Sequence, residues 1–327
     1  MYADAHCDIS DSILYVYPEK REQFELFRPT EARWSPHQID IDGIRKAGTK
    51  LMVWSMCPID VDTKPMRVSS RYDEFRRHLD LYQELLSRFD DHFTLISSAH
   101  DLNETFLAHD RVGVILHIEG MDCVANAKHV EELYHLGVRS FGLVGISGNQ
   151  IATSATTHTD DPTPISELGK QIIAVLETLP VALDCAHLNT VAFNDVAEQS
   201  KKPLYVSHTN CRSLCPDRGQ NLTDTQLKLV ADHNGLVGLS FFPKLLTGSE
   251  AGTDDLIHHL DHALTILGPD HLCFGSDFDG MSHPAMVGLE TISQIPQLFD
   301  ALRDHVSPEH LHKIAFENLF RYFQKVL

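Results

Sequence analysis

The chain opens with a histidine and a carboxylate two positions apart, in the stretch DAHCDIS at residues 4–10. In an extended strand, residues i and i+2 project to the same face, so His6 and Asp8 would lie side by side while Cys7 would point the other way. An imidazole beside a carboxylate is a ligand pair for a divalent metal ion. A lone pair of this kind is more often part of a solvent-facing strand, so a metal site needs partners elsewhere in the chain.

Four more ionisable side chains end apolar runs further along the chain. Glu119 ends VGVILHIE, His187 ends VALDCAH, His208 ends LYVSH and Asp277 ends LCFGSD. If these runs are parallel strands of one barrel, their C-terminal ends meet at one face. Imidazoles and carboxylates gathered there suit zinc, and the set is large enough for two ions, with Glu119 able to give one oxygen to each.

Nine short apolar runs alternate with helix-like stretches, and this alternation predicts the fold. The runs cover residues 2–8, 50–56, 93–99, 112–119, 138–145, 181–187, 204–208, 236–241 and 272–277. Near-continuous apolar runs suit strands buried on both faces, so we expect a parallel sheet covered by helices, a (β/α)8 TIM barrel of the metal-dependent hydrolase type. The barrel needs eight strands, so the run at 93–99 is expected to lie outside it. Because no repeat, low-complexity segment or linker divides the chain, we expect residues 1–327 to form one domain.

The composition restricts the partners. The 327 residues are 43% hydrophobic and 22% charged, and 46 acidic against 27 basic side chains give a formal charge of −19. Such a charge repels nucleic acid and anionic lipid, which leaves small molecules as the expected partners. No apolar run reaches the roughly 18 residues of a membrane span, and the first residues lack a secretion signal. We therefore expect a cytoplasmic protein whose seven scattered cysteines are reduced.

The motifs, in this order, resemble those of the renal or membrane dipeptidase family of TIM-barrel zinc peptidases. DAHCDIS resembles the opening strand of that family, HIEG its bridging-glutamate segment, VALDCAHLN and VSHTNCRSL its two histidine strands, and FGSDFDG its last-strand motif. The resemblance extends from residue 3 to about residue 325. It implies two Zn²⁺ ions, one bound by His6, Asp8 and Glu119, and the other by Glu119, His187 and His208.

The reaction implied by the resemblance is metal-assisted hydrolysis of the amide bond of a dipeptide, without a covalent enzyme intermediate. A hydroxide bridging two zinc ions is a nucleophile near neutral pH, and the same ions polarise the scissile carbonyl. Asp277 would be the general acid and base that passes the proton to the leaving amine. The sequence contains no nucleophilic-serine elbow and no phosphate-binding loop that would favour another chemistry.

Two substrate-binding positions depart from the family pattern. Where the family has a histidine after its fourth barrel strand, this chain has Gly145, and His158 in the same loop is the candidate replacement. Where the family has an arginine before the Asn of an RNLTD-like segment, this chain has Gln220, with Arg218 two residues earlier. Arginine suits a planar carboxylate through bidentate hydrogen bonds, so Arg218 is the candidate contact for the terminal carboxylate of the substrate.

Three alternatives stay open. The first is a related small-amide hydrolase, for example one that acts on N-acyl amino acids, and the second is a metal-binding barrel that has lost peptidase activity. The third, a metal-dependent TIM-barrel deoxyribonuclease, shares the strand-end ligands, but such enzymes typically open with HxH, and the charge of −19 opposes a phosphate backbone.

Two conspicuous helical stretches are expected to have no chemical role. DLIHHLDHAL places His258 and His262 four residues apart, but without a glutamate in HExxH order we expect these two and His259 on a solvated helix face. The amphipathic stretch at 72–89 is mixed in charge. We expect it to cover the barrel or, at most, to form the surface of a homodimer.

Overall fold

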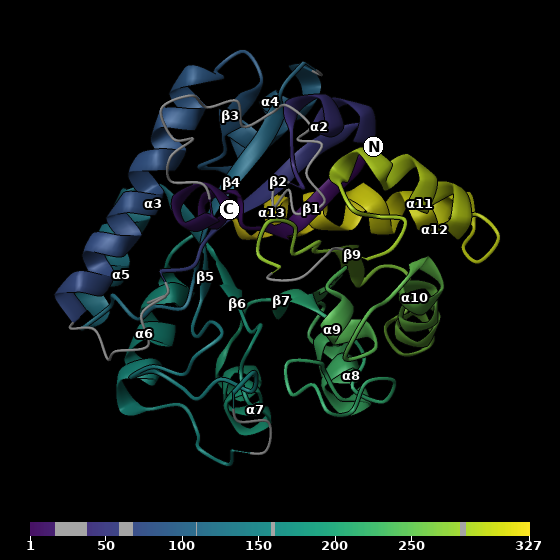
Figure 1. The fold of residues 1–327 in the computed structure, drawn as a ribbon. Helices are drawn as coiled ribbons and strands as arrows, with labels where there is room; N and C mark the ends of the chain where they lie inside the picture. The colour runs from purple at the N-terminus through teal and green to yellow at the C-terminus, as the bar shows by residue number, and fades with distance from the viewer. Residues whose placement is uncertain (17–37, 59–67, 109, 158–160, 282–285) are drawn as a thin grey trace.

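Eight parallel strands close into a barrel in the computed structural model, which describes residues 1–16, 38–58, 68–108, 110–157, 161–281 and 286–327. The strands are β1 (Tyr2–Cys7), β2 (Thr49–Met56), β4 (Val112–Glu119), β5 (Val138–Gly142), β6 (Ala182–Asp184), β7 (Tyr205–Thr209), β8 (Leu236–Leu239) and β9 (Leu272–Phe274). They follow the order β2-β1-β9-β8-β7-β6-β5-β4, and pairing of β2 with β4 closes the ring (Figure 1). The predicted (β/α)8 barrel is confirmed.

The ninth strand, β3 (Phe93–Leu95), lies outside the barrel, as predicted for the run at 93–99. Strand β4 pairs with β2 along residues 113–118 and with β5 along residues 116–119. Strand β3 meets only residues 112–114 of β4, at the end that β5 leaves unpaired. It therefore extends one edge of β4 without entering the ring.

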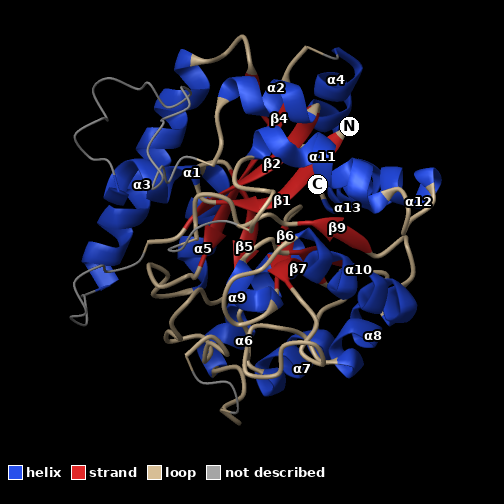
Figure 2. Ribbon diagram, turned by 45° about the vertical axis from the view of Figure 1, so that its right-hand side comes forward, coloured by secondary structure: helices blue, strands red, loops and turns tan. Residues whose placement is uncertain are grey.

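Helices surround the strands on the outside of the barrel (Figure 2). The longer ones are α2 (Ile41–Ala47), α3 (Val68–Arg88), α4 (Ala99–Ala108), α5 (Ala127–His135), α6 (Glu167–Thr178), α7 (Thr190–Gln199), α8 (Asp224–Asp232), α10 (Thr253–Leu267), α11 (Ile295–Leu302) and α13 (Asn318–Val326). Shorter helical segments are α1 (Ile9–Asp11), η1 (Ser12–Val16), α9 (Pro243–Leu246), η3 (Ile292–Gln294), α12 (Pro308–His312) and η4 (Lys313–Glu317). All but the last residue of the stretch at 72–89 belongs to α3, where Phe75, Leu79, Tyr82 and Leu85 are fully buried, so α3 covers the barrel as expected.

Apolar side chains fill the N-terminal half of the barrel. Ala3, Leu51 and Ile115 belong to one buried cluster that also contains Leu319 and Phe323 of α13. This packing closes the N-terminal half with apolar groups. It leaves the C-terminal ends of the strands as the place where buried polar side chains gather.

Two further features of the fold are the state of its cysteines and the character of its helices. All seven cysteines are buried and none forms a disulfide, as predicted for reduced structural thiols. Among the residues that the structure describes, no helix has both the length and the apolar character needed to cross a bilayer.

Candidate metal centre and active-site cavity

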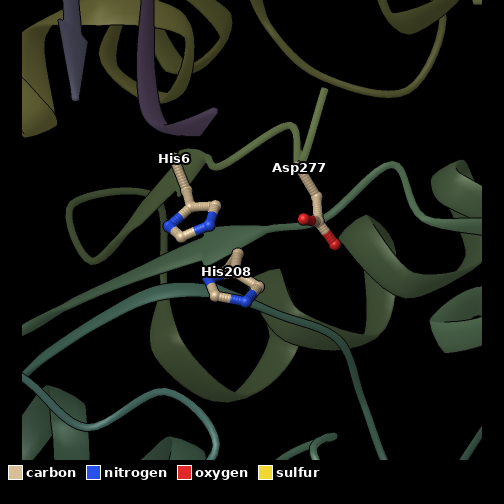
Figure 3. A group of neighbouring side chains, drawn as sticks. All are labelled: His6, His208 and Asp277. Atoms are coloured by element: carbon tan, nitrogen blue, oxygen red, sulfur yellow. The ribbon is translucent and has the colours of Figure 1, made fainter. Parts of the chain in front are cut away.

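Six ionisable side chains meet at the C-terminal mouth of the barrel, as the strand-end pattern predicted. Their ligand atoms form three groups, each within 4.8 Å: His6 with Asp8 and Glu119, Glu119 with His187 and His208, and His6 with His208 and Asp277. All six residues are buried. Figure 3 shows how His6, His208 and Asp277 gather around one point.

Glu119 lies at the centre of this group and divides its two oxygens between two histidines. Its Oε2 lies 3.1 Å from His6 Nε2, and its Oε1 lies 2.8 Å from His187 Nε2. Asp8 Oδ2 is 3.2 Å from His6 Nε2, and His208 Nε2 is 2.9 Å from His187 Nε2. The result is two adjacent sets of donors that share one carboxylate, the arrangement that a two-ion centre requires.

Several of these buried polar atoms make no hydrogen bond to the described residues, which fits a metal ion as their missing contact. Neither ring nitrogen of His6 makes a hydrogen bond, and neither does Asp8 Oδ1, within the described part of the chain. Buried polar groups are normally satisfied, so unpaired atoms that converge on one point indicate a site for a ligand. Imidazole nitrogens and carboxylate oxygens are the donors that zinc takes in proteins.

Two histidines are oriented from behind by polar neighbours. His208 Nδ1 is 2.9 Å from Ser207 Oγ, and this hydroxyl donates to Asp184 Oδ2 at 2.5 Å. His187 Nδ1 is 2.8 Å from Thr156 Oγ1. A histidine that donates from Nδ1 keeps the Nε2 lone pair available for a metal, which is how outer partners fix the tautomer in metal sites.

The charges of the site favour a cation. Although burial disfavours a charged imidazole, the neighbouring Asp8 and Glu119 raise the pKa of His6 well above its usual value. Burial, together with the neighbouring His6 and His187, lowers the pKa of His208 well below the usual value and keeps that ring neutral. Carboxylates that attract a proton onto one histidine attract a metal ion by the same force.

Asp277 lies at the edge of this group and faces the cavity. Burial, followed by the negative charge of Asp8, raises its pKa to about 7. Its backbone φ is 64°, and His187 has a φ of 65°, so both side chains project from left-handed turns that follow β9 and β6. The two predicted runs thus extend past the ends of their strands. Such conformations are uncommon for residues other than glycine and concentrate at functional sites.

A cavity of about 280 Å³ opens beside the donor group. Five carboxylates and two cationic side chains lie in its wall, which is lined by Asp8, Asp11, Cys57, Glu119, Ile146, Thr156, His187, His208, Asp217, Arg218, Gly219, Gln220, Phe242, Lys244, Leu245, Asp277 and Gly280. The cationic side chains among these are Arg218 and Lys244. The remaining charged members are carboxylates, so the cavity is acidic apart from one basic wall.

Both substrate positions that depart from the family pattern lie next to the proposed metal ligands. A Cβ atom at Gly145 would lie 3.4 Å from Glu119 Oε1 and 3.3 Å from Glu119 O, so glycine lets this loop pack closely against the central carboxylate. Gln220 Nε2 lies 3.4 Å from His187 Nε2. Arg218, the candidate contact for the substrate carboxylate, lines the cavity, and its Nη2 donates to Gly248 O at 2.9 Å. His158 lies outside the described residues.

The structure adds groups that we did not predict from the sequence. Asp184 and Ser207 lie within VALDCAH and LYVSH, close to the histidines they support, and this proximity was a usable signal. Asp11 and Lys244 line the cavity from α1 and α9. No spacing rule identifies these two residues, because only the tertiary fold places them at the barrel mouth.

The expectation of three solvated histidines on α10 was wrong for one of them. His258 is exposed, but His259 is buried. His259 Nδ1 accepts from the Cys211 amide at 3.0 Å, and its Nε2 lies 2.9 Å from Leu246 O. These contacts tie α10 to the loops after β7 and β8. His262 is partly exposed and lies 2.9 Å from Asp224 Oδ1.

A barrel with histidines and carboxylates at its strand ends is the architecture of metal-dependent hydrolases. The model of the membrane dipeptidase family, Peptidase family M19, matches residues 2–327, and the chain belongs to this family of metallopeptidases. Among curated relatives, dipeptidase aclJ of Aspergillus oryzae is 27% identical over 293 residues, which cover 87% of this chain and 69% of that protein. Dipeptidase tcpJ of Claviceps purpurea is 28% identical over 333 residues, which cover 99% of this chain and 76% of that protein.

Solved structures show the same fold. A metallo peptidase from Rhodobacter sphaeroides, liganded with a phosphinate mimic of the dipeptide L-Ala-D-Ala, superposes with a TM-score of 0.88 at 24% identity and covers 100% of this chain and 99% of that chain. The probable dipeptidase PvdM from Pseudomonas aeruginosa has a TM-score of 0.81 at 19% identity, covering 95% of this chain and 99% of its own. Both agree with the barrel seen here.

Proposed function

We propose that this protein hydrolyses the amide bond of dipeptides with two Zn²⁺ ions. The observation that carries the proposal is the pair of donor sets that share Glu119 beside a cavity of about 280 Å³. His6, Asp8 and Glu119 would hold one ion, and Glu119, His187 and His208 the other. Bound there, the ions would supply an activated water and polarise the scissile carbonyl. The dipeptidase names of the relatives, and the dipeptide mimic in the Rhodobacter sphaeroides structure, support this substrate class.

In this proposal Asp277 moves the proton. Its carboxylate lies within 4.8 Å of ligand atoms of His6 and His208 and also lines the cavity, so it faces both the donor group and the space for the substrate. A carboxylate there can take a proton from the attacking water and give it to the nitrogen of the leaving amine. The backbone amide of Asp277 donates to His6 O at 3.0 Å, which fixes the position of this turn relative to β1.

Arg218 is proposed to bind the terminal carboxylate of the substrate. Its guanidinium donates from Nη2 to Gly248 O, and the buried Nε makes no hydrogen bond to the described residues. Donors therefore remain for a ligand. Lys244 lies on the same wall and adds a second positive charge. His158 remains a sequence prediction as a further substrate contact.

Hydrolysis of a substrate panel tests the proposal. Zinc-reconstituted protein is incubated with L-L, L-D and D-D dipeptides and with N-acyl amino acids, and the released amino acids are quantified. Cleavage of free dipeptides is the expected result. Cleavage of N-acyl amino acids alone would assign the related small-amide hydrolase instead, and a metal-replete protein that cleaves neither would be a barrel that has lost activity. The cytoplasmic location and the homodimer stay predictions, for cell fractionation and light scattering to test.

A further inference from the structure

Asp11 lies in the cavity wall on the side opposite Arg218 and Lys244, the two cationic side chains of that wall. Asp11 ends α1, which contacts β2 and α3, whereas Arg218 follows β7 and Lys244 lies in α9 after β8. In the ring order β2-β1-β9-β8-β7-β6-β5-β4, strand β7 lies across the barrel from β2. The cavity therefore has a positive wall and, opposite it, a carboxylate that does not belong to the proposed metal ligands.

The segment that carries Asp11 is fixed by hydrogen bonds of its neighbour. Ser10 Oγ donates to Ser55 O at 3.1 Å, and the Ser10 amide donates to the Tyr82 hydroxyl at 3.1 Å. His78 Nδ1 lies 2.8 Å from Ser10 Oγ and 3.3 Å from Asp11 Oδ1. These contacts join α1 to β2 and α3, so the carboxylate is held at a defined place in the cavity wall.

Among the residues that the structure describes, no lysine or arginine forms an ion pair with this carboxylate. The Asp11 side chain is only 16% exposed, and its Oδ1 makes no hydrogen bond within the described residues. Burial lowers the pKa of the adjacent His78 to about 3, so that ring is neutral. Keeping a largely buried carboxylate ionised without a cationic partner is costly, and a positively charged ligand group would stabilise its ionised form.

We propose that Asp11 binds an ammonium group on the N-terminal residue of the substrate and thereby selects free dipeptides over N-acyl amino acids. This inference rests on the proposed function. When Arg218 and Lys244 hold the terminal carboxylate, the other end of the substrate points across the donor group towards Asp11. The ammonium group is either the α-amino group or a basic side chain of that residue, and both present the same chemistry to the carboxylate.

Two matched substrate pairs distinguish these sources. N-acetylalanine lacks only the α-amino group of glycyl-alanine, and norleucyl-alanine lacks only the side-chain ammonium of lysyl-alanine. We would measure kcat and KM for all four with zinc-reconstituted wild type and Asp11→Asn. Wild type should prefer the ammonium-bearing member of at least one pair, and Asp11→Asn should reduce that preference about tenfold or more, mainly through KM. If Asp11→Asn loses the preference in the first pair, Asp11 binds the α-amino group. If it loses the preference in the second pair, Asp11 binds the side-chain ammonium.

Two further variants serve as controls. Asp217→Asn removes the exposed carboxylate beside Arg218 and should keep the preference, which separates a specific contact from a general loss of negative charge. Asp11→Glu retains the charge and should retain most of the preference even if Asp11→Asn folds poorly. If the preferences of Asp11→Asn stay within about twofold of those of wild type in both pairs, the inference is overturned, while the dipeptidase proposal stays intact. A wild type that cleaves none of the four compounds would overturn both.

Discussion

Glu119 and His187 lie 2.8 Å apart at the barrel mouth, although they come from different strand ends, β4 and the turn after β6. The second oxygen of the same carboxylate lies 3.1 Å from His6. A side chain that reaches both donor sets should affect both ions, whereas a histidine at one side should affect only one. This difference makes the proposed two-ion centre testable by counting metal.

The first prediction concerns metal content. Protein purified without chelator should contain close to two zinc ions per chain, as expected from two donor sets. His208→Ala should lose one ion because it removes one imidazole from one set, and Glu119→Ala should weaken both sites because it removes the shared carboxylate. Elemental analysis of protein after gel filtration gives the count. A wild type that keeps only trace metal after reconstitution would contradict the two-ion proposal.

The second prediction separates proton transfer from metal binding. Asp277→Asn keeps the size of the side chain but cannot carry a proton at this position. It should retain metal and fold while lowering turnover by roughly 10²- to 10⁴-fold, the usual cost of losing a general acid or base. Dipeptide turnover, elemental analysis and thermal unfolding are measured on the same preparation. A rate within a few-fold of wild type would show that Asp277 has another role.

The third prediction concerns the support behind His208. Asp184 accepts from the Ser207 hydroxyl, which contacts His208 Nδ1, and Asp184 Oδ1 also accepts from the Ser207 amide at 2.9 Å. Asp184→Asn should weaken binding of one metal ion about 10- to 100-fold, because His208 loses its fixed orientation. Competition with a chelator measures the affinity, and the absorption spectrum of the cobalt-substituted protein reports the changed coordination.

An exposed carboxylate provides the control for Asp184. Asp232 pairs with Lys228 on the outside of α8, and Asp232→Asn changes the net charge by the same amount. It should leave the affinity and the cobalt spectrum at wild-type values. Equal effects of the two substitutions would mean that Asp184 acts only through net charge.

The barrel and the donor group could be predicted from the sequence because both follow from local patterns. Apolar runs bounded by ionisable residues indicated buried parallel strands, and the geometry of a barrel brings all C-terminal strand ends to one face. The position of His6, Glu119 and His208 therefore needed no knowledge of long-range contacts. The sequence excluded the run at 93–99 from the barrel only because a barrel needs eight strands. The structure gives the physical reason, since β3 pairs with only three residues of β4.

The rest of the cavity depends on contacts between segments far apart in the chain. Asp11 reaches the cavity because hydrogen bonds hold the adjacent Ser10 against β2 and α3. Lys244 reaches it because α9, which follows β8, lies at the barrel mouth. The same reason explains the error at His259. A helical pattern indicated a solvated face, but the loop containing Cys211 covers that face and bonds to the ring. Such coverage leaves no periodic signal in the sequence.

The fourth prediction concerns stability at acidic pH. Burial lowers the pKa of His78 from 6.5 to about 3, so the folded state resists protonation that the unfolded state accepts. The contribution of the neutral His78 ring to the free energy of unfolding is complete above pH 6.5 and is lost as the pH falls from 6.5 towards 3. At pH 5 the loss should be about 2 kcal/mol. Urea unfolding of metal-free wild type and His78→Gln at pH 7.5 and pH 5 measures it, and the variant should show a drop smaller by about that amount. An equal drop in both proteins would exclude His78 as the cause.

The last prediction tests the basic wall of the cavity. If Arg218 holds the terminal carboxylate of the substrate, Arg218→Ala should raise KM for free dipeptides by the equivalent of about 1.5 to 3 kcal/mol, the range for a hydrogen bond to a charged group. Capping the carboxylate as an amide should then weaken wild type far more than the variant, because the variant has already lost that contact. Lys244→Ala is the matched comparison, since it removes the other positive charge of the same wall. If the cap affects wild type and Arg218→Ala equally, but no longer affects Lys244→Ala, the carboxylate is bound by Lys244. If the cap has no effect on any of the three proteins, this wall does not bind a carboxylate, and the substrate is a small amide other than an ordinary dipeptide.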